Sequence, residues 1–210
     1  MRPKLITFDI FGTVLDWKKG MSISCDAVGR PLNSEEFEQI LEVQGEMEAD
    51  HFLTYSEITS KSLMRVLNME ESIADEISNN IGYWPLFSDA SVIKELMEIA
   101  PCAAMTNSDV IHGMQVQESL GFQLSDWLCA EDSGFYKPDP KVWETMAVRQ
   151  GIEFGPHWWH VSAYADFDLS VANGLGLTTV FVRRPHSRPG TATYEIESLL
   201  ELQNLIMGPG

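Results

Sequence analysis

The chain is poor in positive charge. It has 14 lysine and arginine residues against 31 aspartate and glutamate residues, which gives its 210 residues a net charge of −17 at pH 7. This excess repels the phosphates of nucleic acids and anionic membrane surfaces. We therefore expect neither a nucleic-acid partner nor a membrane partner. An anionic substrate would need a local cationic group that acts against the overall charge.

Cysteine is also scarce. Cys25, Cys102 and Cys129 are odd in number and far apart, which fits neither a disulfide framework nor a zinc-binding pattern. We expect all three to be buried, in a protein of the reducing cytoplasm. No apolar run approaches the ~18 residues of a membrane span, and the N-terminus lacks the features of a signal peptide.

What the chain does have is a regular alternation of short apolar runs and amphipathic segments from residue 88 onward. The predicted strands are 102–106, 128–130, 158–161 and 178–182, and the predicted helices are 90–99, 109–120, 140–150, 167–175 and 194–205. Alternation of this kind predicts βαβ units and a parallel sheet.

The N-terminal part has a different pattern of apolar and polar residues. Residues 5–8 form a short apolar run that reads as a buried strand, but residues 16–87 show only helical patterns. We expect Ser34 and Ser56 to begin two of these helices as N-caps, and residues 70–81 to form a third. The lone strand must join the later sheet. The sequence therefore predicts an α/β fold: a Rossmann-like parallel sheet core (1–15 and 88–210) with a helical cap domain (16–87) inserted after the first strand.

Several polar residues lie at the ends of the predicted strands or in the loops that follow them. They are Asp9, Thr106 with Asn107, Lys137, and Asp168. In an open parallel sheet, ligands bind outside the carboxyl ends of the strands, so we expect these side chains to converge on one rim. Taken singly, Asp9 could be a turn carboxylate, Asn107 part of a helix cap, and Lys137 a solvated lysine.

Together, these residues suit nucleophilic catalysis. Gly12 permits a tight turn after Asp9, and a carboxylate held there can attack carbon or phosphorus. Pro138 and Pro140 stiffen the loop of Lys137, so that its ammonium can hold Asp9 or a substrate carboxylate.

Four segments, in order, resemble the motifs of the haloacid dehalogenase superfamily of hydrolases. They are Phe8–Asp16, Met105–Asn107, Tyr136–Pro140 and Asp168–Leu177. The resemblance covers the whole chain and implies a cap domain at residues 16–87. It also implies that Asp9 is the nucleophile and that Lys137 orients it.

The residue two positions after the nucleophile separates the branches of that superfamily. Phosphatases carry an aspartate there and a further Gly–Asp–x–x–x–Asp pattern around the fourth motif. This chain has Phe11 at the first position, and Ala163, Tyr164 and Asp168 match the second pattern, so one of its two carboxylates is missing. An aromatic residue at this position resembles the type II 2-haloacid dehalogenases, which need no metal and attack carbon. We therefore expect no cofactor and no metal site.

The resemblance implies specific roles for the remaining site residues. Thr13, Thr106 and Asn107 would hold the nucleophile or the substrate, Asp168 would arrange Lys137 or the hydrolytic water, and Phe11 and Trp17 would form an apolar wall. The sequence thus predicts a hydrolase that forms an aspartyl ester with a small 2-halo acid or a related molecule.

Two features keep alternatives open. The chain departs from the dehalogenase pattern at residues 163–165, and it has no arginine between Arg30 and Arg65, where that branch uses one near the halide. An atypical phosphatase and a non-catalytic protein of this fold remain the alternatives, and a homodimer is open. We assign the glutamates between residues 35 and 48 to the solvated face of a cap helix.

Overall fold

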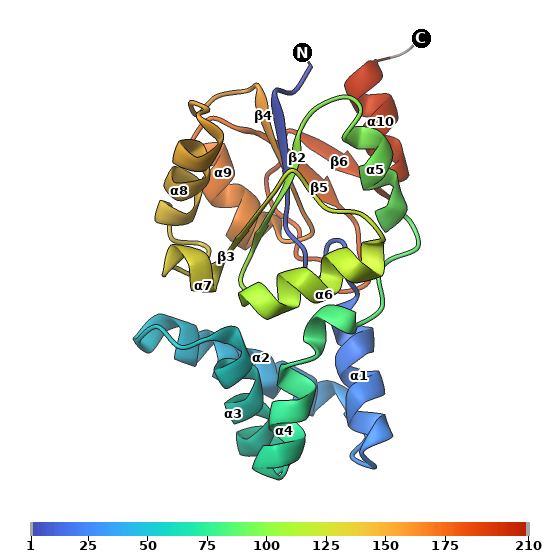
Figure 1. The fold of residues 1–210 in the computed structure, drawn as a ribbon, viewed down its shortest axis with the longest axis vertical. Helices are drawn as coiled ribbons and strands as arrows, with labels where there is room; N and C mark the ends of the chain where they lie inside the picture. The colour runs from blue at the N-terminus through green and yellow to red at the C-terminus, as the bar shows by residue number, and fades with distance from the viewer. Residues whose placement is uncertain (1, 209–210) are drawn as a thin grey trace.

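The computed structural model describes residues 2–208 and contains a six-stranded parallel sheet in the order β3-β2-β1-β4-β5-β6 (Figure 1). The strands are β1 (Leu5–Phe8), β2 (Cys102–Thr106), β3 (Asp126–Cys129), β4 (Trp158–Ser162), β5 (Thr178–Val182) and β6 (Tyr194–Ile196). Neighbouring strands are parallel at every pairing, with Phe8 beside Ala104 on one side and Val161 on the other. The predicted Rossmann-like α/β fold is confirmed.

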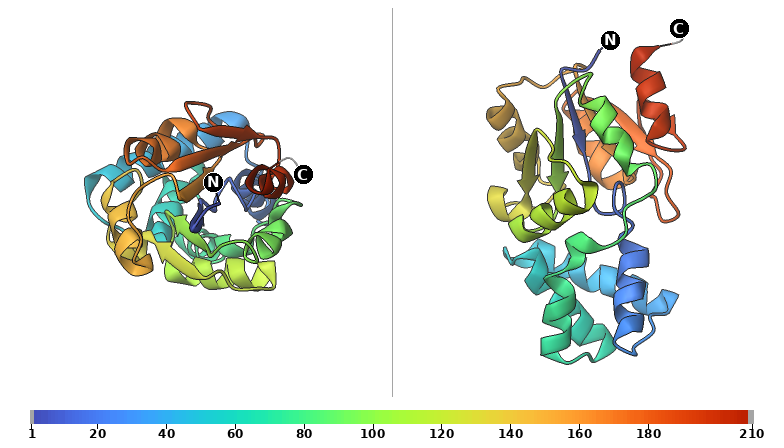
Figure 2. Two further views of the ribbon diagram at one scale, coloured as in Figure 1. Left: turned by 90° about the horizontal axis from the view of Figure 1, so that it is seen from above. Right: turned by 45° about the vertical axis from the view of Figure 1, so that its right-hand side comes forward.

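Helices cover both faces of this sheet and also gather beyond one of its ends (Figures 1 and 2). The α-helices are α1 (Trp17–Ala27), α2 (Ser34–Asp50), α3 (Tyr55–Leu67), α4 (Glu71–Ser78), α5 (Ile93–Leu96), α6 (Val110–Leu120), α7 (Ala130–Ser133), α8 (Lys141–Gln150), α9 (Ser170–Gly174) and α10 (Leu200–Met207). Short 3₁₀ turns η1 (Ile81–Tyr83) and η2 (Ala90–Val92) and a π-helical turn η3 (Ala165–Leu169) complete the chain.

Strands β1, β2, β4 and β5 are buried along their whole length, because helices cover both faces of the sheet. Ile6 and Phe8 belong to the hydrophobic cluster that includes the buried side chains of α5, α6 and α10. Leu5 belongs to a second cluster on the opposite face, which Trp143 of α8 helps to fill. These layers fix the position of β1, and therefore of the residues that follow it.

The segment between β1 and η2 forms the helical insertion, which we define as residues 17–83. It lies beyond the carboxyl end of the sheet, at the bottom of Figure 1. Its buried side chains, such as Met21 and Ile40, join the same hydrophobic cluster as Phe8 of β1. The apolar core is therefore continuous from sheet to insertion, and the division of the chain into two domains stays a prediction.

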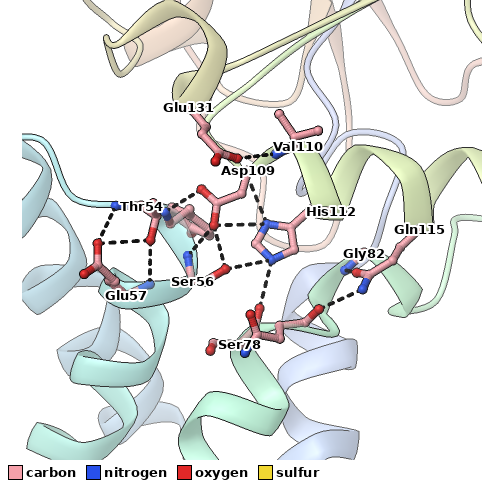
Figure 3. Close-up of polar contacts among 12 residues, drawn as sticks. Thr54, Ser56, Glu57, Ser78, Gly82, Asp109, Val110, His112, Gln115 and Glu131 are labelled. Atoms are coloured by element: carbon pink, nitrogen blue, oxygen red, sulfur yellow. Dashed lines mark hydrogen bonds and ion pairs between the residues drawn. The ribbon is translucent and has the colours of Figure 1, made fainter.

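A group of polar residues, the interface cluster, connects α6 to the insertion. Its members are Ser56, Ser78, Asp109, His112 and Gln115 (Figure 3). Asp109 accepts hydrogen bonds from the backbone N–H groups of Tyr55 (2.7 Å) and Ser56 (2.8 Å), at the start of α3. Nε2 of His112 lies 2.9 Å from the carbonyl oxygen of Ser78, at the end of α4. Gln115 accepts from the Gly82 N–H and donates to the Asn79 carbonyl.

The predicted helix starts in the insertion were wrong by one or two residues. Asn33, not Ser34, caps α2, and Thr54, not Ser56, caps α3. In both helices the residue three positions after the cap is a glutamate that bonds back to the cap, a capping box. Ser56 instead donates to Asp109 across the interface.

Three other element boundaries also differ from prediction. Tyr194–Ile196 forms edge strand β6 beside β5, and the closing helix begins only at Leu200. The strand predicted at 128–130 is β3, which begins at Asp126. The helix predicted at 70–81 ends at Ser78, before η1. Short edge segments depend on the neighbour with which they pair, which local sequence does not reveal.

The three cysteines are buried and unbonded, as expected, while the reducing compartment they suggested stays a prediction. Within residues 2–208, every helix is too short or too polar to serve as a membrane span.

Candidate active site

The predicted polar residues converge where three adjacent strands end. β1 stands between β2 and β4, so the chain turns in opposite directions from neighbouring strands at this point. Asp9 follows β1, Thr106 ends β2, and Asp168 lies in η3, after β4. Lys137 reaches the same place from the loop between α7 and α8.

Lys137 bridges two carboxylates. Its Nζ lies 3.0 Å from Oδ1 of Asp9 and 2.8 Å from Oδ2 of Asp168. All three side chains are buried: Lys137 is 2% exposed, Asp9 is 5% exposed and Asp168 is 0% exposed. Such charges are stable in the interior only when they are paired and hydrogen-bonded, as they are here.

Thr13 holds the other oxygen of Asp9. Its hydroxyl donates to Oδ2 of Asp9 at 2.6 Å and accepts from the backbone N–H of Ala163 at 2.9 Å. The turn that brings Thr13 there depends on Gly12, whose φ of +94° is one that L side chains rarely adopt. A Cβ on Gly12 would also lie 2.0 Å from the hydroxyl oxygen of Tyr164.

His160, which the sequence analysis did not assign to the site, completes this arrangement. Nε2 of His160 lies 3.1 Å from Oδ1 of Asp168, and its Nδ1 lies 2.8 Å from the Thr7 hydroxyl. The indole N–H of Trp158 donates to that same hydroxyl. We call Asp9, Lys137, His160 and Asp168 the active-site cluster. His160 was missed because it lies inside an apolar strand, where a single histidine carries no local signal.

Asn107 holds the loop of Lys137 instead of facing the cavity with free polar groups. Its Oδ1 accepts from the backbone N–H of Lys137 at 2.7 Å, and its Nδ2 donates to the carbonyl of Lys137 at 2.9 Å. Asn107 thus acts on Asp9 only through the loop of Lys137; because Asn107 also lines the cavity, its contact with a substrate stays a prediction. The hydroxyl of Thr106 is buried and has no hydrogen-bond partner among residues 2–208, so its predicted contact with the nucleophile or the substrate stays a prediction.

The pKa values of the two carboxylates in the cluster are shifted in opposite directions. Burial raises the pKa of Asp9, and Asp168 raises it further, against the opposing effects of Lys137 and Thr13. Burial also acts to raise the pKa of Asp168, but Lys137 and His160 outweigh it and hold that pKa well below its usual range. Burial acts to lower the pKa of Lys137, but Asp168 and Asp9 outweigh it and raise it. Asp168 and Lys137 are thus a fixed ion pair, and Asp9 is the more basic carboxylate.

The cluster opens on a cavity of about 530 Å³ between the sheet and the insertion. Phe11, Trp17 and Phe167 line it, while the role of Phe11 and Trp17 as an apolar wall against a substrate stays a prediction. Tyr164 lines it too, and its hydroxyl accepts a hydrogen bond from Nε1 of Trp17 at 2.8 Å. Of the predicted site residues, only Thr13 is not part of the cavity wall, because Asp9 covers it.

Glu48 of α2 also lines this cavity, which corrects its predicted place on a solvated helix face. Its Oε2 lies 3.4 Å from Nδ2 of Asn107. Burial raises the pKa of Glu48 to about 7, although Lys137 and Asn107 act to lower it. Helical periodicity gives the angle between residues of α2 but not the direction from which the sheet approaches, so the sequence could not place Glu48.

The site offers little to a metal ion. Across residues 2–208, no three His, Cys, Asp or Glu side chains are grouped so that they could hold one. Phe11 and Tyr164 supply rings where an acidic ligand set would need oxygen atoms.

The known proteins that are similar to this chain share one fold. No protein-family model matches the chain. It is 24% identical to (S)-2-haloacid dehalogenase 4A of Burkholderia cepacia, over 95% of the chain and 93% of that protein. It is similar to a defluorinating L-2-haloacid dehalogenase (19% identity, TM-score 0.85), over 98% of this chain and 96% of the other. The L-2-haloacid dehalogenase of Xanthobacter autotrophicus, with chloropropionic acid covalently bound, is 14% identical with a TM-score of 0.82, over 99% and 100% of the two chains.

The same fold also serves a protein that binds a metal. A HAD-hydrolase of Bacillus subtilis, solved bound to magnesium, is 18% identical with a TM-score of 0.80, over 99% of this chain and 100% of the other. These similarities confirm the predicted resemblance to the haloacid dehalogenase superfamily, whose fold this chain has.

Proposed function

We propose that this chain, with the fold of the L-2-haloacid dehalogenases, hydrolyses a small molecule at a saturated carbon that bears a halide. The observation that carries the proposal is the pairing of Asp9 with Lys137 beside Phe11. A buried, oriented carboxylate faces a cavity that the rings of Phe11 and Trp17 help to line, and no acid stands two residues after it. The 2-halo acids and related small molecules are the substrate class, as the names of the similar proteins suggest.

In the first step, an oxygen of Asp9 attacks the carbon that bears the halogen. The new C–O bond forms as the carbon–halogen bond breaks, and the halide leaves with the bonding electrons. A halide is the anion of a strong acid and needs no proton, so Phe11 in place of an acid is no obstacle. Thr13 and Lys137 hold the two oxygens of Asp9 in the orientation of attack.

In the second step, water attacks the carbonyl carbon of the Asp9 ester. Once Asp9 is esterified, its side chain carries no negative charge. Asp168 is then the remaining carboxylate that contacts Lys137. Asp168 accepts one proton of the water and passes it to the alkoxide that leaves when the bond between the aspartyl carbonyl carbon and the ester oxygen breaks. The hydroxy product is released, and Asp9 returns to its carboxylate form as the second proton of the water passes to solvent. The ammonium of Lys137 stabilises the oxyanion that forms on the ester.

An oxygen label tests this mechanism. A single turnover of 2-chloropropionate in H₂¹⁸O should leave ¹⁸O in the peptide that contains Asp9, because water attacks the aspartyl carbonyl. EDTA should leave chloride release unchanged. Label found only in lactate after the first turnover would instead indicate direct attack of water on the substrate.

A phosphatase is the second candidate, since a magnesium-bound protein has the same fold. It predicts Mg²⁺-dependent hydrolysis of 4-nitrophenyl phosphate that EDTA abolishes. Phe11 argues against it, because no carboxylate stands two residues after Asp9 to complete a set of hard oxygen ligands for Mg²⁺. A third alternative, a non-catalytic protein of this fold, would bind the 2-halo acid without turnover. Separately, the formation of a homodimer stays a prediction.

A further inference from the structure

An arginine outside the cavity holds the loop that carries Asp9. Arg184 lies two residues after β5, and its Nε donates to the backbone carbonyl oxygen of Thr13 at 3.0 Å. Thr13 is the residue whose hydroxyl donates to Oδ2 of Asp9 at 2.6 Å. A single residue, held by its main chain, therefore connects Arg184 to the proposed nucleophile.

Asp89 fixes the position of this guanidinium. Nη1 and Nη2 of Arg184 donate to the two carboxylate oxygens of Asp89 at 3.0 and 2.8 Å, a bidentate ion pair whose side chains are only 7% and 6% exposed. Asp89 also accepts from the backbone N–H of Leu199 at 2.8 Å. The guanidinium carbon lies 4.1 Å from the ring centroid of Phe87. Each of the three nitrogens of Arg184 thus has a partner.

The same guanidinium joins the two segments that connect the insertion to the sheet. One is the loop after β1, and the other is the segment 84–89, by which the chain returns from the insertion. Backbone hydrogen bonds already link them, one of them from the Phe87 N–H to the Val14 carbonyl at 2.9 Å. Arg184 adds a link between Thr13 of the first segment and Asp89 of the second.

This geometry matters more for reactivity than for stability. A buried ion pair contributes little to the stability of a fold, because the loss of hydration offsets the attraction of the charges. A nucleophile is far more sensitive, since a displacement of ~1 Å can cost about a hundredfold in rate. Without Arg184, the carbonyl of Thr13 would lose its donor, and the hydroxyl that orients Asp9 would lose part of its support.

We propose that Arg184 is a positioning residue for the nucleophile: its hydrogen bond to the Thr13 carbonyl, fixed by Asp89, keeps the Thr13 hydroxyl directed at Asp9. Arg184 lies outside the wall of the cavity, so it acts on the reaction only through Thr13. The kinetic part of this inference rests on the proposed dehalogenation, whereas the effect on Asp9 can be measured without turnover.

Arg184→Lys separates positioning from folding. Lysine keeps the positive charge beside Asp89 but has one nitrogen in place of a fork of three, so it cannot serve the carboxylate and the Thr13 carbonyl with the same geometry. With 2-chloropropionate, we expect kcat to fall about tenfold or more while KM stays within about twofold. Urea unfolding of each variant gives the folded fraction to which its kcat is referred.

The control is Arg149→Lys, which makes the same change elsewhere in the core. Arg149 of α8 also pairs with aspartates, Asp126 and Asp132, but it does not contact the loop of Asp9. We expect Arg149→Lys to leave both kcat and KM unchanged. An equal fall of kcat in this variant would overturn the specific role of Arg184.

A double variant tests whether Arg184 acts through Thr13. Thr13→Val keeps the size of the side chain and removes its hydroxyl, so it should lower kcat by itself. If the effect of Arg184 passes through that hydroxyl, Thr13→Val with Arg184→Lys should be no more than about twofold slower than Thr13→Val alone. Independent structural effects would multiply instead, and such a product would overturn the proposal.

Titration of Asp9, followed by carbon-13 NMR of its carboxyl group, requires no turnover. The hydrogen bond from Thr13 acts to lower the pKa of Asp9, so Thr13→Val should raise that pKa. We expect Arg184→Lys to raise the pKa of Asp9 in the same direction, because the charge at position 184 is retained and only the support of Thr13 changes. Arg149→Lys should leave it unchanged, and Asp9→Asn identifies the signal.

The two readouts keep this inference distinct from the proposed function. A raised pKa of Asp9 in Arg184→Lys supports the positioning role even if no chloride is released, in which case only the dehalogenation fails. An unchanged titration of Asp9 in Arg184→Lys overturns the role. In an active enzyme, a kcat of Arg184→Lys within about twofold of wild type overturns it as well.

Discussion

The active-site cluster and the interface cluster are both built from a buried aspartate and a buried histidine, and they differ in what completes their hydrogen bonds. Asp9 contacts a lysine and a threonine and still lines a cavity. Asp109 accepts hydrogen bonds from two backbone N–H groups and one hydroxyl at the N-terminal end of α3. Residue types alone therefore do not distinguish a reactive aspartate from a structural one; the open side of Asp9 does.

The histidines differ in the same way. His112 accepts from the backbone N–H of Asp109 at Nδ1 and contacts the Ser78 carbonyl at Nε2, so both nitrogens are engaged by main chain. His160 contacts two side chains, one of which is Asp168. Backbone partners fix the position of an element, whereas side-chain partners can change charge together during a reaction.

The largest effect should come from Asp9→Asn. An amide keeps the size of the side chain but is a far poorer nucleophile, so we expect chloride release to fall at least about a thousandfold, ~4 kcal/mol in the barrier. The chain should still fold, with the free energy of unfolding lowered by about 1–3 kcal/mol, because the new NH₂ group would face Lys137 or Thr13, which both donate to Asp9. Activity above about a tenth of wild type would remove Asp9 from the proposed mechanism.

The matched substitution in the other cluster, Asp109→Asn, should lower stability but leave turnover intact. The new NH₂ group would face the N–H groups of Tyr55 or Ser56, so a donor would meet a donor. We expect the free energy of unfolding to fall by about 1–3 kcal/mol. Chloride release per folded molecule should stay within about twofold of wild type. A loss of turnover as large as that of Asp9→Asn would show that the interface cluster takes part in the chemistry.

The two clusters also differ in how far the sequence could predict them. Asp9, Lys137 and Asp168 each follow a strand or lie in a stiffened loop, and parallel strands bring such positions to one rim. Asp109 likewise follows a strand, but its partner is α3, 53 positions earlier at Ser56, which only tertiary packing brings near. Glu48 and His160 were missed for the same reason, since each looks ordinary within its own helix or strand.

A smaller effect should appear with pH. Burial lowers the pKa of His112 below its usual 6.5, although Asp109 and Glu131 act to raise it. The unfolded chain therefore binds a proton more readily, and stability is lost as the pH falls below about 6.5. We expect the free energy of unfolding to drop by up to about 1.4 kcal/mol per pH unit in that window. In His112→Gln this part of the pH dependence should vanish; an unchanged slope would mean that another group causes it.

The smallest effect is expected from Ser56→Ala. Ser56, His112 and Asp109 lie together like a Ser–His–Asp triad, with Oγ of Ser56 3.3 Å from Nε2 of His112. The hydroxyl, however, donates to Oδ2 of Asp109 at 2.6 Å, and a neutral His112 must carry its proton on Nε2 to donate to the Ser78 carbonyl. His112 therefore cannot accept the proton of Ser56, and the three residues lack the relation of nucleophile, base and orienting acid. We expect Ser56→Ala to cost about 1 kcal/mol of stability and to leave both chloride release and hydrolysis of 4-nitrophenyl acetate unchanged. Loss of ester hydrolysis in Ser56→Ala, with no loss in Asp9→Asn, would instead place a second nucleophile in the interface cluster.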